Sequence, residues 1–315
     1  MENIYDIIKN EINTHTNGNS EESNYLLSHL NSLKDQKLNI LFVGATGVGK
    51  SSTINAIFDK EIATVGEWVS PETSIIDKYE IDNLILWDTP GLGDTPEKDN
   101  KYAKSIASLL TSKDEQGHFM IDAVVVLVNA TSKDLGTVYE MLNKVIVPYL
   151  HDNKRIIIAI NQADIAMSGR NWDYDNEVPN PVLLNYLEEK VVSVKHKINS
   201  IFGINITPVY YSATHHYNIS KLLLAIMKAI PLEKRYMIAP GLNKDPEIWK
   251  RNNTDCEYNS EIKKEMEISL TGALKGAEIG AVAGASVGTL VPVIGTAIGA
   301  AVGAALGFLG GLFGK

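Results

Sequence analysis

The sequence contains one stretch whose glycines, lysine and serine have the spacing that phosphate binding requires. Residues 44–51 read G-x-x-x-x-G-K-S, between the apolar run 38–43 and the helical pattern 53–58. Glycines let the backbone turn tightly so that its amides face phosphate oxygens, and the following helix adds its positive N-terminal end. The order of strand, glycine loop and helix is the context that this P-loop motif needs. The residues predicted to hold phosphate are Gly44, Gly47, Val48, Gly49, Lys50, Ser51 and Ser52.

A magnesium ion is predicted beside the phosphates. Lys50 can reach the β- and γ-phosphates, and the Ser51 hydroxyl can bind Mg²⁺. Asp88 ends the predicted strand 84–87 and opens the sequence D-T-P-G. An aspartate at the carboxyl end of a strand beside the P-loop is placed for the magnesium shell.

The loop before the next strand is expected to supply a threonine to the magnesium ion. Thr73, just before the predicted strand 74–80, has the position of a switch-loop ligand, and Thr64 is the alternative. Gly91 closes D-T-P-G and lets a backbone amide approach the γ-phosphate. The predicted catalytic residues are therefore Lys50, Thr73 and Gly91, and the predicted metal ligands are Ser51, Thr73 and Asp88.

A second group of motifs has the chemistry of guanine recognition. Asn161-Gln162-Ala163-Asp164 follows the predicted strand 155–160. Asp164 can accept two hydrogen bonds from N1 and N2 of guanine, whereas adenine would leave this carboxylate unpaired. Asn161 is expected to brace the base and the P-loop, and the stem of Gln162 to cover part of the base. The predicted cofactors are GTP or GDP with Mg²⁺.

The last predicted strand, 206–211, leads into Ser212-Ala213-Thr214. A backbone amide of Ser212 or Ala213 would face guanine O6 at this position. His215 and His216 follow, and we interpret them as loop residues, with titration or metal binding as the alternative. Residues 168–181 form an insert rich in Asn and Asp that also contains Trp172.

Strands and helices alternate along the middle of the chain. This predicts an α/β fold with a mostly parallel sheet and helices on both faces. Residues 82–83 are expected to join strands 74–80 and 84–87 as a hairpin. Residues 59–73 and 93–100 are expected to be irregular. The remaining predicted strand is 122–128, and the predicted helices are 101–110, 135–150, 183–202 and 219–230, with a helical lead-in at 4–12 and 25–33.

Composition limits the classes of function. The 315 residues carry a formal net charge of −9, so the chain has no overall basic footprint for nucleic acid. A single cysteine, Cys256, excludes a disulfide framework and a cysteine metal site, which fits a reducing compartment. The first residues lack the apolar core of a signal peptide. We therefore expect a cytoplasmic protein.

Taken together, the motifs resemble those of the TRAFAC-class GTPases of the Era/TrmE type. The details T-G-V-G-K-S-S-T-I-N-A, D-T-P-G-L-G-D and N-Q-A-D look like the bacterial YfjP-like branch. The resemblance covers about residues 38–230. It implies the P-loop GTPase fold, GTP binding, Mg²⁺ dependence, and slow hydrolysis coupled to a conformational switch.

Two positions depart from this pattern. Leu92 stands where Ras-like switches carry a glutamine that orients the attacking water, and leucine has no donor or acceptor. Water must therefore be positioned by another residue or by a partner. Gly47 stands where potassium-activated members of the TrmE type carry asparagine, so we expect little effect of potassium.

The C-terminal segment has a different composition. No charged residue occurs between positions 279 and 314, and glycines recur every four positions on either side of Pro292. Such repeats allow close helix packing, and each half is long enough to cross a bilayer. The sequence therefore predicts a glycine-zipper hairpin that associates with the inner face of the membrane. A soluble hairpin folded onto the main domain is the alternative.

The predicted divisions are a helical lead-in at 1–37, a GTPase domain at 38–232, a connector at 233–267, and the hairpin at 268–315. Trp249 is the residue through which the connector would dock. The expected partners are a guanine nucleotide, a membrane through 268–315, and a second copy in a homodimer or oligomer. Three functions stay open: a membrane-associated switch, a soluble assembly- or ribosome-associated GTPase, and a membrane-perturbing effector under GTP control.

Overall fold

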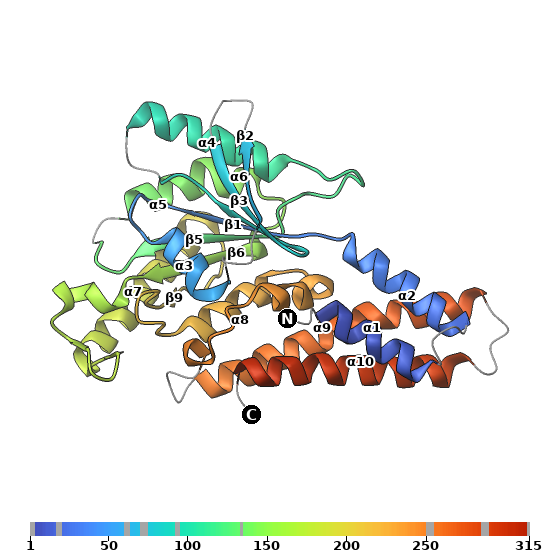
Figure 1. Cartoon of the computed structure of the whole chain (residues 1–315). Helices are drawn as coiled ribbons and strands as arrows, with labels where there is room; N and C mark the ends of the chain where they lie inside the picture. Colours follow the sequence, from blue (N-terminus) through green and yellow to red (C-terminus); the bar gives the residue numbers. More distant parts are fainter. Residues whose placement is uncertain are drawn as a thin grey trace.

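A mixed sheet forms the centre of the computed structural model (Figure 1), which describes residues 4–16, 21–59, 64–69, 75–91, 95–132, 135–249, 255–284 and 290–313. Its strand order is β2-β3-β4-β1-β5-β6-β9. The strands from β4 to β9 are parallel, and β2 and β3 add an antiparallel edge. The predicted α/β class is therefore confirmed. The strands are β1 (Leu38–Gly44), β2 (Thr64–Val69), β3 (Ile75–Ile81), β4 (Leu84–Asp88), β5 (Ala123–Asn129), β6 (Ile156–Asn161) and β9 (Val209–Tyr210).

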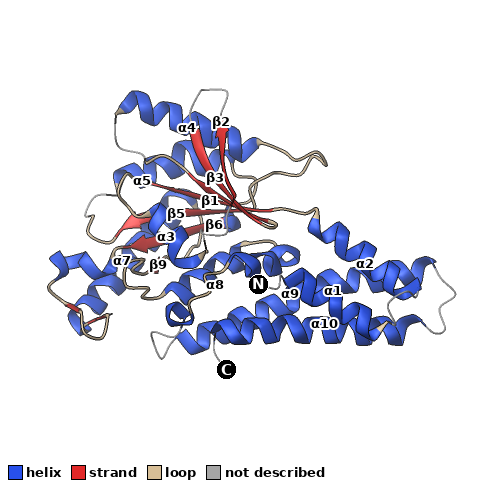
Figure 2. Ribbon diagram, in the orientation of Figure 1, coloured by secondary structure: helices blue, strands red, loops and turns tan. Residues whose placement is uncertain are grey.

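Helices cover both faces of the sheet (Figure 2). Along β1, Ile40 and Phe42 belong to one buried cluster, and Leu41 and Val43 to the other, because successive side chains point to opposite faces. The first face is covered by α3 (Lys50–Ile57) and α8 (Ile219–Ala229). The second is covered by α4 (Pro96–Thr111), by α5 (Gly136–Met141) with its continuations η2 (Leu142–Ile146) and α6 (Val147–Tyr149), and by α7 (Pro181–Phe202).

The predicted pattern is wrong in two places on the β2 side of the sheet. Residues 64–69 form an edge strand, although the glycine and proline signals of 59–73 indicate irregular chain. The α4 helix begins at Pro96, inside the stretch 93–100 that was expected to be irregular. Thr95 caps this helix by accepting a hydrogen bond from the Lys98 amide, and proline suits the first helical position.

The N-terminal and C-terminal helices pack together as a bundle beside the sheet domain (Figure 1). It contains α1 (Ile4–His15), α2 (Glu21–Lys34), α9 (Asp255–Gly284) and α10 (Leu290–Phe313). The predicted helical lead-in belongs to this bundle: α1 lies along α10 and α2 along α9. Apolar residues at helical spacing explain this, because their buried faces meet. These residues include Ile8, Ile12, Leu26, Leu30, Ala297 and Ala301.

The described parts of the stretch predicted as a connector, residues 233–249 and 255–267, pack against the rest of the molecule. η5 (Leu232–Gly241) and η6 (Pro246–Trp249) follow α8, and α9 already begins at Asp255, inside the range 233–267. Trp249 is fully buried, donates to the Asn243 carbonyl over 2.8 Å, and meets the Phe313 ring edge-on. Docking through this tryptophan is therefore confirmed.

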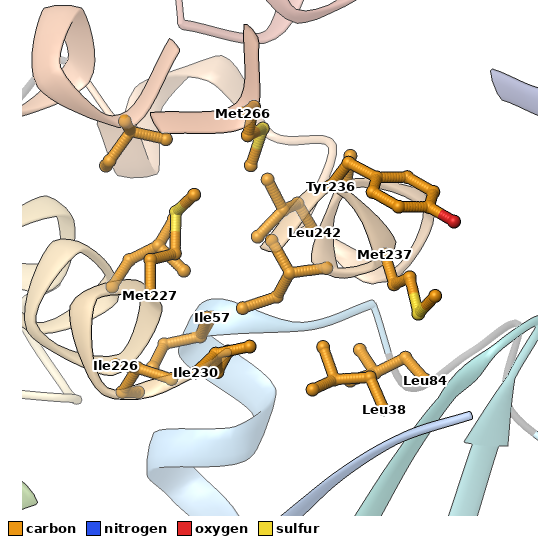
Figure 3. Close-up of a cluster of buried hydrophobic side chains, with 14 of the residues drawn as sticks. Leu38, Ile57, Leu84, Ile226, Met227, Ile230, Tyr236, Met237, Leu242 and Met266 are labelled. Atoms are coloured by element: carbon orange, nitrogen blue, oxygen red, sulfur yellow. The ribbon is translucent and has the colours of Figure 1, made fainter. Parts of the chain in front are cut away.

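An apolar cluster joins the sheet domain to the bundle (Figure 3). Leu38 and Leu84 come from the sheet, Ile57 from α3, and Met266 from α9. Side chains of α8, of η5 and of the turn between them fill the remaining space; they include Ile226, Met227, Ile230, Tyr236 and Met237. Because all of these side chains are buried together, the bundle and the sheet share one core.

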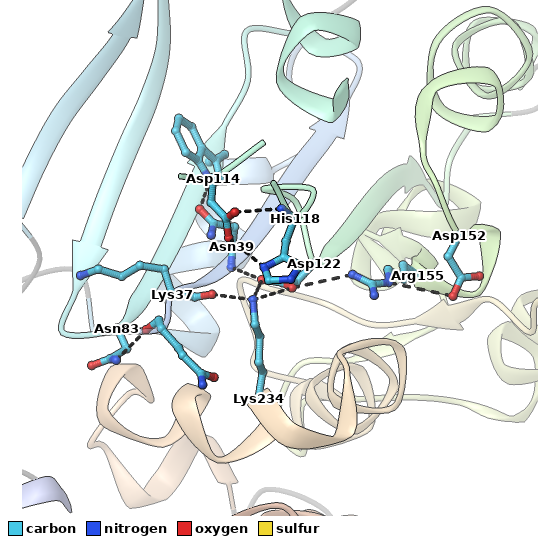
Figure 4. Close-up of polar contacts among 11 residues, drawn as sticks. Lys37, Asn39, Asn83, Asp114, His118, Asp122, Asp152, Arg155 and Lys234 are labelled. Carbon is cyan, nitrogen blue, oxygen red and sulfur yellow. Dashed lines mark hydrogen bonds and ion pairs between the residues drawn. The ribbon is translucent and has the colours of Figure 1, made fainter. Parts of the chain in front are cut away.

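A polar network lies at the same joint (Figure 4). Asp122 is buried and accepts from the Asn39 amide over 2.9 Å and from Lys234 Nζ over 2.9 and 3.0 Å. Lys234 also donates to the Lys37 carbonyl over 2.8 Å. Burial raises the pKa of the Asp122 carboxyl, and the nearby Lys234 and Arg155 charges oppose this rise. Lys234 thus fixes η5 to the amino-terminal ends of β1 and β5.

The glycines of α10 do not form the predicted helix seam. Gly295, Gly299, Gly303, Gly307 and Gly311 lie on the exposed face, and a Cβ added at any of them would meet no atom within 4 Å. The buried face carries Ile294, Ala297, Ile298, Ala301, Ala305 and Leu309 instead. Burying these apolar side chains removes more surface from water than burying glycine would, so the face that carries them packs against the other helices. Gly284 and its neighbours lie outside the residues whose side chains are described.

Two leucine substitutions on α10 should have opposite effects on stability. Gly299→Leu should be neutral or should stabilise the protein by up to about 1 kcal/mol, because the site is open and leucine favours helix over glycine. Ala301→Leu should destabilise it by about 1–3 kcal/mol, because it overfills the bundle. Urea unfolding of both variants tests this. Equal destabilisation would mean that the glycine face is packed.

Candidate functional site

The P-loop lies at the carboxyl ends of β1 and β4 and borders a cavity of about 340 Å³. Its lining includes the loop residues 46–52 apart from Val48, together with Asp77 and residues 88–91. Lys50 is buried, and its Nζ donates to the carbonyls of Gly44 and Ala45 over 3.2 Å each. The ammonium group is thus folded over the loop, beside the space where a phosphate chain would lie.

Two oxygen donors suited to a hard cation meet in this cavity. Ser51 Oγ donates to Asp88 Oδ2 over 2.6 Å, and Asp88 is buried. A hydroxyl and a carboxylate at this distance fit Mg²⁺, which prefers oxygen ligands and keeps several waters. Asp77 pairs with Asp88 across the β3–β4 ladder and also lines the cavity. Two adjacent strands, β3 and β4, therefore each bring a carboxylate to this cavity.

The register of β2 on β3 argues against Thr64 as a ligand of the predicted magnesium ion. Thr64 pairs with Glu80, near the end of the β3–β4 ladder opposite to Asp88. Strands rise about 3.3 Å per residue, so Thr64 lies too far from Asp88 to share a metal with it. Thr73 lies outside the described residues, as does Leu92.

The D-T-P-G loop rests directly on the P-loop. Thr89 Oγ1 donates to the Phe42 carbonyl over 2.9 Å, which anchors this loop to β1. A Cβ at Gly91 would stand 2.3 Å from Thr46 Oγ1 and 2.4 Å from Thr46 Cα. Only glycine fits so close to the backbone, so the Gly91 amide can stay next to the phosphate-binding loop.

Asn161 joins the phosphate-binding loop to the other motifs. Its Nδ2 donates to the Val48 carbonyl over 2.9 Å, and its Oδ1 accepts from the Ala213 amide over 3.1 Å. Gln162 Nε2 donates to the Gly47 carbonyl over 3.0 Å. Gly49 has a φ of 91°, and a Cβ there would stand 2.4 Å from Asn161 Nδ2. The loops after β1, β6 and β9 are thereby locked together.

Asp164 lies beside these loops as a buried carboxylate. It is 6% exposed, and its Oδ1 has no hydrogen-bond partner among the described residues. Its Oδ2 lies 3.9 Å from His215 Nε2. Leaving a buried acceptor unsatisfied costs about 1–3 kcal/mol or more for a charged group, so the position suits a ligand that brings donors.

The insert after β6 packs against this position, and sequence reasoning missed its role. It contains β7 (Trp172–Asp173) and β8 (Val178–Pro179). Trp172 is buried and its ring contacts those of His215 and Tyr217. Glu177 Oε1 lies 3.1 Å from His215 Nδ1. The sequence signal for this arrangement is a pair of aromatic residues, Trp172 and Tyr174, in a largely polar insert.

The structure brings most of the predicted site residues to one edge of the sheet. Ser212 accepts from the His215 amide over 3.2 Å through its Oγ, which shapes the loop that carries Ala213. The residues that meet at this edge are Gly44, Gly47, Val48, Gly49, Lys50, Ser51, Ser52, Asp88, Gly91, Asn161, Gln162, Asp164, Ser212 and Ala213.

Comparison with known proteins relates part of the chain to GTPases. Residues 39–162 match the family described as 50S ribosome-binding GTPase. GTPase Der of Clostridium botulinum (strain Okra / Type B1) is 29% identical over 136 residues, which is 42% of this chain and 29% of Der. The probable GTP-binding protein EngB of Methanococcus aeolicus is 28% identical over 173 residues, 53% of this chain and 59% of that protein. The chain thus spans less than a third of the length of Der.

The solved structures that resemble this chain have low TM-scores. The G domain of the T. maritima FeoB iron transporter gives a TM-score of 0.37 at 17% identity, over 62% of this chain and 99% of that domain. A probable GTP-binding protein engB gives 0.35 at 19% identity, over 61% of this chain and 98% of that chain. The fold, the loop geometry and the family match of residues 39–162 relate this part of the chain to the P-loop GTPases.

Two alanine substitutions in the P-loop should separate backbone strain from steric conflict. Gly47 and Gly49 both have positive φ, so each alanine should cost about 1–2 kcal/mol. At Gly47 the new Cβ meets nothing within 4 Å, whereas at Gly49 it collides with Asn161. Urea unfolding without nucleotide should therefore show a clearly larger loss for Gly49→Ala. Equal losses would mean that the Asn161 contact is absent in solution.

Proposed function

We propose that this protein binds GTP and GDP with Mg²⁺ and hydrolyses GTP slowly to GDP and phosphate as a conformational switch. The observation that carries this proposal is Asp164, a buried carboxylate whose Oδ1 lacks a partner among the described residues. Asn161 ties its loop to the P-loop, so one ligand can reach both. Guanine offers the two adjacent donors that such a carboxylate accepts, and adenine does not. The resemblance of the motifs favours a YfjP-like branch of these GTPases.

The phosphate chain would lie in the P-loop cavity. Backbone amides from Gly47 to Ser51 would cradle its oxygens, and Lys50 would turn from the loop carbonyls to the β- and γ-phosphates. Ser51 and Asp88 would hold Mg²⁺, with Thr73 as the proposed third ligand. The ion neutralises charge on the phosphates when it is bound.

We infer slow turnover from Leu92, whose side chain has no polar atom with which to orient water. In GTPases of this type, stimulated hydrolysis depends on a water-positioning group, so a partner would supply one here. Gly47 has no side chain that could help to hold a potassium ion, which argues against potassium activation.

The bundle is the part of the molecule that we propose responds to nucleotide. The end of α3, the P-loop helix, is hydrogen bonded to the segment after η5: the Asn243 amide donates to the Ile57 carbonyl over 2.8 Å, and the Asp59 amide to the Gly241 carbonyl over 2.9 Å. In turn, the Tyr236 amide of η5 donates to Ser269 Oγ of α9 over 3.1 Å. A movement of α3 would therefore be passed to α9.

Membrane association through α10 is a second candidate, favoured by one observation. Within the described residues, Ile294–Phe313 is the only helix long and apolar enough to cross a bilayer. Its apolar face is buried against the other bundle helices. Insertion would therefore require α10 to leave the bundle, and nucleotide exchange would have to drive this step.

Substitution of Asp164 tests the guanine proposal. Wild type should bind GDP far more tightly than ADP. Asp164→Asn should weaken GDP binding and improve binding of xanthosine diphosphate, because the asparagine amide presents a donor where xanthine has a carbonyl acceptor. Titration with fluorescent nucleotides measures this. Lys50→Ala is the control, because it should weaken every nucleotide by loss of phosphate contacts. Similar affinities of wild type for GDP and ADP would contradict the proposal.

A charge on the open face of α10 tests the membrane candidate. Gly299→Lys should leave the bundle intact because the position is exposed, but a lysine at the centre of a bilayer helix costs about 2.5–3.5 kcal/mol. Liposome flotation compares both proteins with GDP and with a GTP analogue. Bilayer entry predicts that wild type floats with the analogue and that Gly299→Lys does not. Wild-type protein that stays unbound in both nucleotides rules the candidate out.

A further inference from the structure

A second set of hydrogen bonds links the loop after β9 to the P-loop, through the side chain of Tyr211. This residue is fully buried and follows β9 directly. Its amide donates to the Ile160 carbonyl over 2.9 Å, and its carbonyl accepts from the Ala163 amide over 3.1 Å. These two backbone bonds attach Tyr211 to the end of β6 and to the loop that follows it, on either side of Asn161.

The phenol of Tyr211 meets the hydroxyl of Thr53 in the first turn of α3. The two oxygens lie 2.6 Å apart, and both side chains are fully buried. Thr53 Oγ1 also donates to the Gly49 carbonyl over 2.7 Å. A threonine hydroxyl has one proton, so Thr53 uses it on Gly49 and Tyr211 is the donor in the other bond. The hydrogen bonds therefore run in one direction, from the phenol through the hydroxyl to the carbonyl.

This chain of hydrogen bonds ends on a peptide group of the P-loop. The Gly49 carbonyl also accepts from the Thr53 amide over 2.9 Å, so two bonds hold it toward α3. In a planar trans peptide the carbonyl and the next amide point in opposite directions, so the Lys50 N–H points toward the N-terminal end of the helix. Gly49 and Lys50 line the P-loop cavity at that end. Glycine has several accessible backbone conformations, so this peptide needs partners to fix its direction.

We propose that Tyr211 is a positioning residue for phosphate binding: its hydroxyl, acting through Thr53, holds the Gly49–Lys50 peptide so that the Lys50 amide faces the phosphate chain. The inference rests on the proposed binding of guanine nucleotides. A hydroxyl that accepts a hydrogen bond becomes a stronger donor, so the phenol strengthens the bond to Gly49. Because Tyr211 is also attached to the loops after β6 and β9, it holds these loops at a fixed distance from the phosphate-binding peptide.

Removal of the phenol oxygen tests this role, and the neighbouring Tyr210 provides a matched control. The Tyr210 side chain lies on the opposite face of the sheet, where its hydroxyl donates to Glu188 over 2.7 Å. Tyr211→Phe should bind a fluorescent GDP analogue about three- to tenfold more weakly than wild type, the equivalent of one hydrogen bond. Tyr210→Phe should bind it as wild type does. Urea unfolding without nucleotide measures the stability lost in each variant, which separates a folding defect from a binding defect.

Two substitutions of Thr53 separate the hydroxyl from its packing. Thr53→Val keeps the shape of the side chain and should weaken GDP binding at least as much as Tyr211→Phe does. Thr53→Ser keeps the hydroxyl and should restore the affinity that valine loses. The double variant Thr53→Val/Tyr211→Phe should bind no more weakly than Thr53→Val alone, because both side chains act through one chain of hydrogen bonds. The ³¹P NMR signals of bound GDP should shift in Tyr211→Phe and in Thr53→Val, and should not shift in Tyr210→Phe.

Wild-type GDP affinity in Tyr211→Phe, or equal losses in Tyr211→Phe and Tyr210→Phe, would overturn the role of Tyr211. Equal losses in Thr53→Ser and Thr53→Val would also overturn it, because packing rather than the hydroxyl would then hold the peptide. If Tyr211→Phe does not fold, the comparison of serine with valine at position 53 decides alone. Wild-type protein that binds no GDP would instead overturn the proposed function, and this inference with it.

Discussion

The site depends on the side chain of Asn161 more than on any other group. Its amide donates to the P-loop through Val48 and accepts from the Ala213 amide, so three loops from separate strands share one hydrogen-bonding group. Asn161 is buried, and losing either partner would leave a polar atom unsatisfied. A side chain at position 49 would collide with this amide, and the backbone there also has a positive φ that favours glycine. Phosphate and base motifs are therefore one unit, although they lie far apart in the sequence.

The second constraint is the joint between the sheet and the bundle. A buried ion pair alone is weak evidence for stability, because desolvation offsets the attraction. Lys234 has a geometric role instead: its three hydrogen bonds reach Lys37 and Asp122, at the amino-terminal ends of β1 and β5. The apolar cluster around Leu242 and Met266 supplies the buried area (Figure 3), and the lysine fixes the register of η5 on the sheet. The P-loop lies at the opposite end of the same strands, so the joint does not obstruct it.

Much of this arrangement could be predicted, because the signals are local. The apolar strands, the hairpin at 82–83 and the glycine loop each follow from a few neighbouring residues, and parallel strands bring their carboxyl ends together. Three features could not be predicted, because each depends on residues distant in sequence. β2 is an edge strand that pairing with β3 stabilises despite Gly66. The contact of Glu177 with His215 needs a folded insert. Glycine periodicity identified a stripe on α10 but could not say which face packs inward.

The two halves of the candidate site are built from different kinds of group. The P-loop half consists of backbone amides, a glycine loop and the buried side chain of Lys50, whose Nζ donates to the Gly44 and Ala45 carbonyls. The base half is built from side chains, with Asp164 and Glu177 on either side of a histidine. Under the proposed function, the phosphate chain would be held mainly by backbone groups that the loop fixes in place. Under the proposed function, base selection would depend on side chains, so a substitution at Asp164 could alter it without rebuilding the P-loop.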